Sequence, residues 1–245
     1  MKKTLIYIRN YIGFLVFFIF LFIGIFPIFL SLIFKDRKIL SSYVKFVIRI
    51  LMMIFGLKTE TINFNKELYG SKQWVVIGNH VSFLDPIILF AIFPGILRFM
   101  YKSGLDKLPI ISSGLKTIGF VSVDRKNPRK GQKAIKTAIE LIKKDKDSIA
   151  IFPEGGRSIS GKIRNFKRGA FVLAKENKIP ILPVYLKGFY QAMPKGRNII
   201  YPATLIFEFL SPIEVSKIEK LSSEELRDYA HNLFLEKERE NERDN

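Results

Sequence analysis

A histidine and a carboxylate at short spacing are the first candidates for chemistry in this chain. His80 follows Asn79, and Asp85 stands five residues after the histidine, directly before Pro86. A carboxylate bonded to one imidazole nitrogen fixes the tautomer and stabilises the protonated ring, so the other nitrogen can take a proton from a hydroxyl group. The pair therefore predicts a general base that activates an alcohol. The alternative is a turn histidine beside an aspartate that only caps a helix.

A glycine-rich motif with an arginine follows about seventy residues later, where Phe152 to Ser158 reads Phe-Pro-Glu-Gly-Gly-Arg-Ser. Gly155 and Gly156 permit a close backbone approach. Arg157 offers a planar fork of donors that suits a phosphate group, and backbone amides of a glycine turn can add to it. The motif predicts a phosphate-binding loop. The alternative is an ordinary turn after a strand.

A third motif lies between these two and ends in an acid and a base. Gly119 to Val123 is a short apolar run, and Asp124 and Arg125 follow it. Arg125 is a second candidate for binding phosphate. The alternative is a surface ion pair at the end of a strand.

Each of the first two motifs follows an apolar run, at 73–78 and at 148–152, which predicts a buried strand. His80 then stands just past a strand end. Asp85 and Pro86 are favoured at a helix start. In a continuous helix, residues five apart point roughly 140° away from each other, but a strand, a turn and a helix can bring Asp85 back onto the His80 ring.

Strands and helices alternate along the rest of the chain. Strands are predicted at 73–78, 97–102, 119–123, 148–152, 181–186 and 204–210, and helices at 85–92, 107–117, 128–145 and 168–177. This order favours an α/β fold with a mixed, largely parallel sheet flanked by helices. The candidate residues fall at strand C-terminal ends, where ligands bind in such sheets. Ser222 to Glu225 is a capping box that predicts the start of a last helix.

The first fifty-eight residues predict a membrane-associated module. Tyr11 to Phe34 is an uncharged run of 24 residues, and as a helix it would measure about 36 Å, more than the roughly 30 Å of hydrocarbon in a bilayer. Pro27 interrupts the run and predicts a kink or a re-entrant path. The run is too long for a typical signal peptide and lacks a small-residue cleavage site.

The next segment, Ile39 to Leu57, is apolar except for a stripe on one helical face, made of Lys38, Ser42, Lys45 and Arg49. That pattern predicts a helix lying in the membrane interface, and an inserted helix with snorkelling lysines is the alternative. Basic residues flank the first helix on both sides, so the charge bias leaves its orientation open. A shallow two-helix hairpin accounts for both flanks.

These segments predict three parts: membrane-embedded or interfacial helices at 1–58, an α/β catalytic domain at 59–235, and a charged C-terminal tail at 236–245 that frays from Glu236 onward.

Charge and composition limit the classes of function. The chain of 245 residues has 40 basic and 22 acidic side chains, a net charge of +18, two histidines and no cysteine. The absence of cysteine excludes disulfides, cysteine-ligated metals and a cysteinyl acyl-enzyme, and two histidines argue against a histidine metal site. A nucleic-acid partner is one interpretation of the charge. The membrane segments, and the absence of any nucleic-acid-binding motif, favour anionic lipid instead.

Taken in order, these motifs resemble those of the glycerolipid acyltransferase family, of the 1-acyl-glycerol-3-phosphate acyltransferase type. The first block corresponds to Asn79, His80 and Asp85, the second to Gly119–Arg125, the third to Phe152–Ser158, and the fourth to Ile179–Val184. Lys102 resembles a basic position between the first two blocks. The resemblance covers roughly residues 73 to 187.

The resemblance implies a membrane enzyme of phospholipid biosynthesis that works on the cytoplasmic face of its membrane. In a bacterium this would be the inner membrane. His80 and Asp85 would act as the catalytic pair, without an acyl-enzyme. The acceptor would be held by three cations, Lys102, Arg125 and Arg157, and by further residues of the first and third blocks, namely Asn79, Glu154, Gly155, Gly156 and Ser158. The implied substrates are a lysophospholipid and an acyl thioester of coenzyme A or of acyl carrier protein, with no bound cofactor, metal or nucleic acid.

One residue departs from the family pattern. The third block usually has threonine after Glu-Gly, and here Gly156 stands there. This leaves the acceptor headgroup open, so a remodelling acyltransferase acting on another lysophospholipid is an alternative. A non-catalytic lipid-binding protein is another, although binding alone needs no base.

Overall fold

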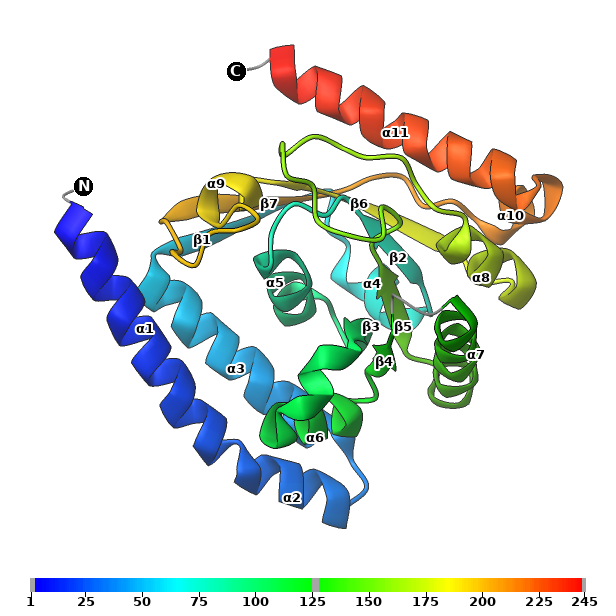
Figure 1. Cartoon of the computed structure of the whole chain (residues 1–245). Helices are drawn as coiled ribbons and strands as arrows, with labels where there is room; N and C mark the ends of the chain where they lie inside the picture. The colour runs from blue at the N-terminus through cyan, green and yellow to red at the C-terminus, as the bar shows by residue number, and fades with distance from the viewer. Residues whose placement is uncertain (1–2, 125–127, 244–245) are drawn as a thin grey trace. The chain divides into compact units, whose positions relative to one another are not determined.

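The computed structural model describes residues 3–124 and 128–243, which divide into two compact units. One unit, called here the helical unit, comprises Met1–Leu57 and Pro86–Asp147. The other, called here the sheet unit, comprises Lys58–Asp85 and Ser148–Asn245. Figure 1 shows the elements of both.

The sheet unit contains most of the strands. Its strands are β1 (Leu57–Ile62), β2 (Val75–Gly78), β5 (Ser148–Ile151), β6 (Ile181–Lys187) and β7 (Ala203–Phe209), in the spatial order β1-β7-β6-β2-β5. β2 is parallel to both β5 and β6, while β7 is antiparallel to β6. The central strand β2 is buried along its length, with Val75, Val76 and Ile77 fully inaccessible. Such a strand is apolar throughout because both faces are covered.

Helices complete the sheet unit. They are α4 (Lys66–Ser71), α8 (Gly169–Asn177), α9 (Phe189–Ala192), α10 (Val215–Lys220) and α11 (Ser223–Arg243). α8 packs on β2, and α11 packs on β6 and α8. The predicted capping box is confirmed, because Ser222 and Glu225 exchange side-chain to backbone hydrogen bonds of 2.8 and 3.1 Å.

The part of the predicted charged tail that the structure describes, residues 236–243, is helical, since α11 continues to Arg243. Lys237 forms ion pairs with Glu208 on β7 and with Glu240. Lys187 at the end of β6 donates to the side chain of Asn241 at 3.1 Å. These contacts with the sheet hold the last turns of the helix.

The helical unit contains the helices α1 (Lys3–Ile23), α2 (Ile25–Ile33), α3 (Arg37–Phe55), α5 (Leu84–Ile92), η1 (Ser103–Lys107), α6 (Pro109–Ile118) and α7 (Pro128–Asp145). The first two residues of α5, Leu84 and Asp85, belong to the sheet unit. Two parallel strands, β3 (Leu97–Lys102) and β4 (Val121–Val123), belong to it as well. The strands other than β1, and helices α5, α6, α7 and α8, match the predicted segments within a few residues. The expected α/β architecture with a mixed, largely parallel sheet is therefore confirmed.

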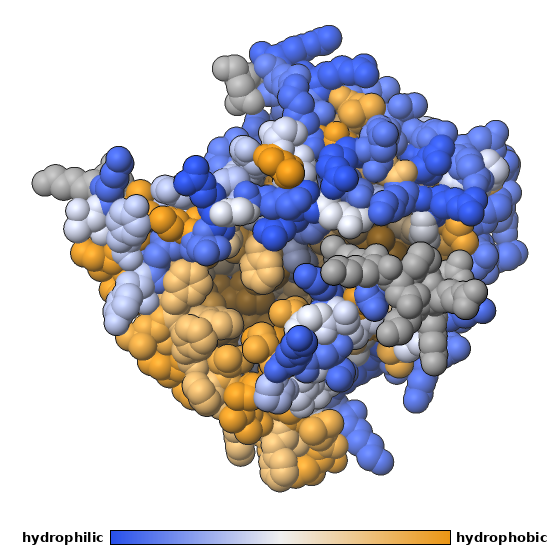
Figure 2. All heavy atoms as spheres, viewed as in Figure 1, coloured by the Kyte–Doolittle hydropathy of each residue, from blue (hydrophilic) through white to orange (hydrophobic). Residues whose placement is uncertain are grey.

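The first two helices place small or polar residues inward and large apolar residues outward. Asn10, Gly13 and Ser31 are buried. Gly13 lies against the ring of Phe55, and the Ser31 hydroxyl accepts the Leu40 N–H at 3.0 Å. The helices are separated at Gly24, near the expected kink, and Lys3–Ile33 is long and apolar enough by length and composition to cross a membrane. Figure 2 shows apolar side chains gathered over α1 and α2.

The third helix lies alongside α1 and α2 (Figure 1). Of its predicted basic stripe, Lys38 and Arg49 are exposed, but Lys45 is half-buried and donates to the carbonyls of Phe93 and Gly95 at 2.7 and 2.6 Å. Lys45 therefore binds the main chain just after α5, whereas Lys38 and Arg49 are exposed on the helix surface.

Candidate active site

The chain leaves β2 through Asn79, whose side chain fixes the exit. Its amide nitrogen donates to the Leu186 carbonyl at 3.0 Å, and its amide oxygen accepts the Leu186 N–H at 2.7 Å. These paired bonds join the end of β2 to the neighbouring strand β6. Asn79 thus holds the backbone from which the next side chain, His80, projects.

His80 and Asp85 lie in direct contact. His80 Nδ1 and Asp85 Oδ2 are 2.7 Å apart, and the same oxygen accepts the N–H groups of Val81 and Ser82 at 2.7 and 2.8 Å. The turn before α5 therefore folds around the carboxylate. Instead of capping its own helix, Asp85 binds the turn that precedes it.

Burial sets the electrostatics of this pair. Asp85 is completely buried, and its Oδ1 has no hydrogen-bond partner in the described part of the chain. Burial raises the pKa of Asp85 above the usual range of a carboxyl group, and the three hydrogen bonds at Oδ2 oppose this shift by stabilising the ionised form. The arrangement holds the carboxylate in one orientation against the imidazole.

The His80 ring is fixed from its face as well as its edge. It stacks on Phe152 with centroids 4.3 Å apart and planes at 16°. Because Nδ1 faces Asp85, Nε2 is the nitrogen left for chemistry, and none of the residues in 3–124 or 128–243 forms a hydrogen bond with it. The geometry can accept a proton at Nε2 and stabilise the resulting imidazolium at Nδ1.

The third motif grips the main chain of His80 on both sides. Glu154 Oε1 accepts the His80 N–H at 2.8 Å, and the Ser158 N–H donates to the His80 carbonyl at 2.7 Å. Both residues are buried. Sequence reasoning associated Glu154 and Ser158 with the acceptor, whereas their contacts in the structure are with the backbone of the candidate base.

The Glu154 carboxyl group is itself in an unusual environment. Its Oε2 is buried and has no hydrogen-bond partner among the described residues. Burial raises the pKa of Glu154 to about 7, against the opposing effect of hydrogen bonds from the backbone of His80 and Arg164 and of the Arg164 charge. With a pKa of about 7, this carboxyl group changes its protonation state near neutral pH while it accepts the His80 backbone N–H.

The two glycines of the motif have different reasons to be there. Gly155 has a φ of +71°, and a Cβ on it would lie 2.9 Å from the Lys167 side chain, so only glycine fits without strain. Gly156 has no such φ, and a Cβ there would be 3.7 Å from Arg164 Nη1, an ordinary contact. The second position could therefore hold a side chain.

Several cations surround this loop. The half-buried Arg157 guanidinium lies 5.9 Å from the centroid of the Phe83 ring, and no carboxylate of the described chain pairs with it. Lys195 Nζ donates to the Arg157 carbonyl at 3.2 Å, and Arg164 Nη1 donates to the Gly156 carbonyl at 3.3 Å. Sequence reasoning missed Arg164, Lys167 and Lys195. The basic run that begins at Lys162 was the available signal for the first two.

The remaining expected residues lie elsewhere or have structural contacts. Lys102 ends β3 in the helical unit, with an exposed side chain. Arg125 lies outside the described residues. Ser82, a further residue of the first motif, donates its hydroxyl to the Met193 carbonyl at 2.7 Å and accepts the Leu84 N–H at 3.2 Å. The sheet unit alone thus brings together Asn79, His80, Asp85 and the motif from Glu154 to Ser158.

Comparison with known proteins gives matches to acyltransferases. A family model described as Acyltransferase matches residues 60–187. The chloroplastic 1-acyl-sn-glycerol-3-phosphate acyltransferase BAT2 of Brassica napus is 33% identical over 162 residues, which are 66% of this chain and 46% of that protein. A Saccharomyces cerevisiae protein named 1-acyl-sn-glycerol-3-phosphate acyltransferase is 28% identical over 173 residues, 70% of this chain and 56% of that protein. The chain spans about half the length of these relatives.

A solved structure has the same fold. The crystal structure of PlsC from Thermotoga maritima, titled a 1-acyl-sn-glycerophosphate acyltransferase, superimposes with a TM-score of 0.82 over 96% of this chain and 95% of that one, at 24% sequence identity.

Proposed function

Because this chain belongs to the acyltransferase family, we propose that it transfers a fatty acyl group from a thioester to the sn-2 hydroxyl of 1-acyl-glycerol-3-phosphate, forming phosphatidic acid. The names of the relatives support the substrate. The observation that carries the chemistry is the 2.7 Å contact between His80 Nδ1 and Asp85 Oδ2, which leaves Nε2 available. Sequence and geometry point to the same general base.

The reaction then proceeds by direct attack. Nε2 of His80 takes the proton of the acceptor hydroxyl, and its oxygen forms a bond to the thioester carbonyl carbon. The tetrahedral intermediate collapses with cleavage of the carbon–sulfur bond, and the proton passes from His80 to the departing sulfur. Asp85 holds the ring and balances the charge of the imidazolium. No covalent enzyme intermediate forms.

Arg157 is the proposed principal contact for the acceptor phosphate. It is half-buried in the same loop as Glu154, and within the described residues its guanidinium has no acidic partner, so its donors are available for phosphate oxygens. Lys102 and Arg125 are proposed as further phosphate ligands on the strength of their place in the family pattern. Lys195, which contacts the Arg157 carbonyl, adds positive charge to the loop.

The proposed setting is the cytoplasmic face of a membrane. The outward apolar side chains of α1 and α2 favour insertion of the segment 1–58, with the α/β domain of 59–235 carrying the chemistry. The net charge of +18 suits an anionic bilayer and an anionic donor. Coenzyme A and acyl carrier protein both meet that description.

The test is acyl transfer by the purified, detergent-solubilised protein from a long-chain acyl thioester to 1-acyl-glycerol-3-phosphate, with both kinds of donor. His80→Ala should reduce turnover at least about a thousandfold, the upper part of the range for loss of a general base. His231→Ala, at the other histidine of the chain, is the matched control and should remain active. A His80→Ala protein that retains a tenth of the activity would contradict the mechanism.

The second candidate function is transfer to another lysophospholipid, and Gly156 is the observation that favours it. The same assay with lysophosphatidylcholine, lysophosphatidylethanolamine and lysophosphatidylglycerol decides between the two. Preference for one of these over 1-acyl-glycerol-3-phosphate would assign the enzyme to remodelling. Silence with every acceptor would support a non-catalytic lipid-binding protein.

A further inference from the structure

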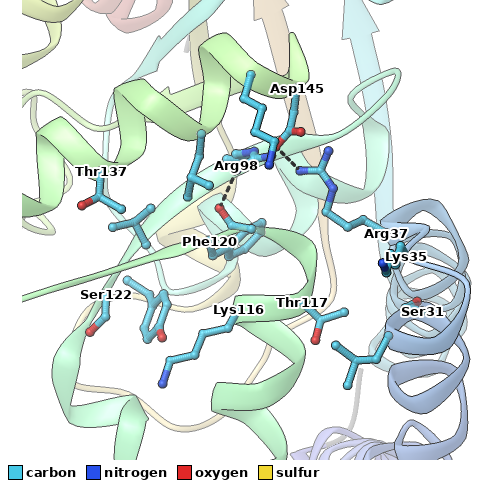
Figure 3. A pocket seen from close by; sticks show the side chains of 16 residues that line it. Ser31, Lys35, Arg37, Arg98, Lys116, Thr117, Phe120, Ser122, Thr137 and Asp145 are labelled. Atoms are coloured by element: carbon cyan, nitrogen blue, oxygen red, sulfur yellow. Dashed lines mark hydrogen bonds and ion pairs between the residues drawn. The ribbon is translucent and has the colours of Figure 1, made fainter.

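A cavity of about 590 Å³ lies within the helical unit, where the apolar helix α2 ends (Figure 3). Its lining comes from the end of α2, the loop after it and the first residue of α3, from β3 and β4, and from helices α6 and α7. Among the described residues, none that we assign to the proposed reaction lines it. The cavity therefore calls for an explanation of its own.

The floor of the cavity is a closed network of charges. Arg98 is buried, and its guanidinium binds Asp145, Asp147 at 2.8 Å and the Gly119 carbonyl at 3.3 Å. Arg37, at the first turn of α3, binds the same two aspartates at 3.0 and 2.9 Å. Figure 3 shows both arginines converging on Asp145. The two arginines and two aspartates have no net charge together. This network therefore forms the floor of the cavity but adds no unpaired charge to it.

The free positive charge comes from three lysines on the rim, Lys35, Lys116 and Lys144, all of which are exposed or partly exposed. Lys116 has one loose ion pair, 3.5 Å from Asp106, with 61% of its side chain exposed. Lys35 and Lys144 pair with no carboxylate in the described ranges of the chain. The rim therefore carries an excess of cations from three separate elements.

The walls add apolar surface to this rim. Leu32, Phe120 and Leu141 line the cavity together with hydroxyl-bearing side chains such as Thr117. A site that combines an apolar wall with three cations suits an amphipathic anion better than a small ion. Leu32 also belongs to the exposed apolar face of α2.

We propose that this cavity binds one anionic phospholipid of the bilayer, with its phosphate at Lys35, Lys116 and Lys144 and the start of its acyl chains along Leu32 and Phe120. Lys35 follows Leu32 by three residues, so the change from apolar to basic occurs at the mouth of the cavity. That change places the mouth at headgroup depth if α2 enters the membrane as proposed above. The bound lipid would fix the helical unit to anionic membranes, independently of the reaction.

The test uses the full chain in a neutral detergent and measures binding of dihexanoyl phosphatidylglycerol by calorimetry. Dihexanoyl phosphatidylcholine and inorganic phosphate serve as the zwitterionic and free-anion probes. The test variant is Lys116→Gln with Lys144→Gln. The matched control is Lys107→Gln with Lys143→Gln, two exposed lysines of the same unit that do not line the cavity.

We expect phosphatidylglycerol to bind about tenfold more weakly to the test variant than to wild type, because this variant loses two basic residues next to the lipid headgroup. Binding to the control variant should stay within about twofold of wild type, because its two lysines lie outside the cavity. Phosphatidylcholine should bind weakly to all. Equal weakening in both variants would overturn the proposal, because it would mean attraction by net charge alone. Inorganic phosphate that binds as tightly as the lipid would also overturn it, in favour of a free-anion site. His80→Ala should leave lipid binding unchanged, so the result stands apart from the assay of turnover.

Discussion

Glu154 accepts the backbone N–H of His80 at 2.8 Å, across 74 residues of sequence. Together with the bond from the Ser158 N–H to the His80 carbonyl, this contact makes the loop of the third motif a clamp on the candidate base. The loop that is proposed to bind phosphate through Arg157 and the residue that is proposed to move the proton are therefore held by one set of hydrogen bonds. A shift in one must displace the other.

The clamp predicts different effects for two substitutions of Glu154. Glu154→Gln keeps an oxygen that can accept the His80 N–H, so turnover should fall by less than about threefold. Glu154→Ala leaves that buried N–H without a partner, which costs about 1–3 kcal/mol, and should lower kcat at least about tenfold. Steady-state kinetics of the two purified variants check this. Equal loss in both would mean that the negative charge of Glu154, and not its position, matters.

The protonation of Glu154 predicts a pH-dependent stability. Its pKa is raised by burial to about 7, from 4.5 in an unfolded chain. Between these values the unfolded chain has released the proton and the folded protein retains it, so rising pH favours unfolding. The contribution is about 3 kcal/mol, lost between pH 4.5 and 7. Glu154→Gln removes it, so the Tm of wild type relative to this variant should decrease from pH 5 to pH 8. A constant difference would contradict a buried titrating carboxyl group.

Asp85 predicts a change in kcat with little change in KM. Asp85→Asn can keep an oxygen facing the N–H groups of Val81 and Ser82, so the turn should persist. Without the carboxylate the His80 imidazolium loses its stabilising charge, and kcat should fall by about 10² to 10⁴. KM for the acceptor should stay within about threefold, since Arg157 is unaffected. Circular dichroism checks the fold. If the Asp85→Asn protein had the kcat of wild type, the role of Asp85 would be limited to its hydrogen bonds with the turn.

Much of this architecture could be predicted from local patterns, and the exceptions depend on distant contacts. Strand β2 is apolar on both faces, and the capping box at Ser222 involves only four consecutive residues. Both could therefore be predicted from the local sequence. Strand β1 was missed because five of its six residues are exposed, which leaves no apolar pattern. The helical end of α11 was missed because Lys237 depends on Glu208, which lies on β7.

The same distinction applies to the candidate site. The contact of His80 with Asp85 could be predicted because it spans one turn of strand, loop and helix. The contact of Glu154 with His80 could not, because a hydrogen bond to a backbone N–H places no demand on the type of residue that donates it. A carboxylate in a glycine-rich loop therefore suggested a ligand contact, when its partner in the structure is the main chain.

The packing of α1 on α3 predicts opposite outcomes for two helical glycines. A Cβ at Gly13 would lie 2.4 Å from the ring of the buried Phe55, whereas a Cβ at Gly114 would lie 3.6 Å from Ile28 Cδ1. Gly13→Ala should therefore destabilise the helical unit by about 1–3 kcal/mol through overpacking. Gly114→Ala should be neutral or stabilising by up to about 1 kcal/mol, because alanine favours a helix. Thermal unfolding in detergent compares them. Equal Tm values would mean that α1 does not pack on Phe55.

The position of Gly156 predicts a gain of acceptor selectivity. Its φ is compatible with a side chain and a Cβ would meet Arg164 Nη1 at 3.7 Å, so Gly156→Thr should fold with little loss of stability. If the missing hydroxyl contributes a hydrogen bond to a charged acceptor, about 1.5–3 kcal/mol, then kcat/KM for 1-acyl-glycerol-3-phosphate should rise at least about tenfold relative to lysophosphatidylcholine. Gly156→Val has the same shape without the hydroxyl and is the matched control. Identical selectivity in the threonine and valine variants would mean that this position does not contact the acceptor, and the acceptor preference would then have to come from the cations around Arg157.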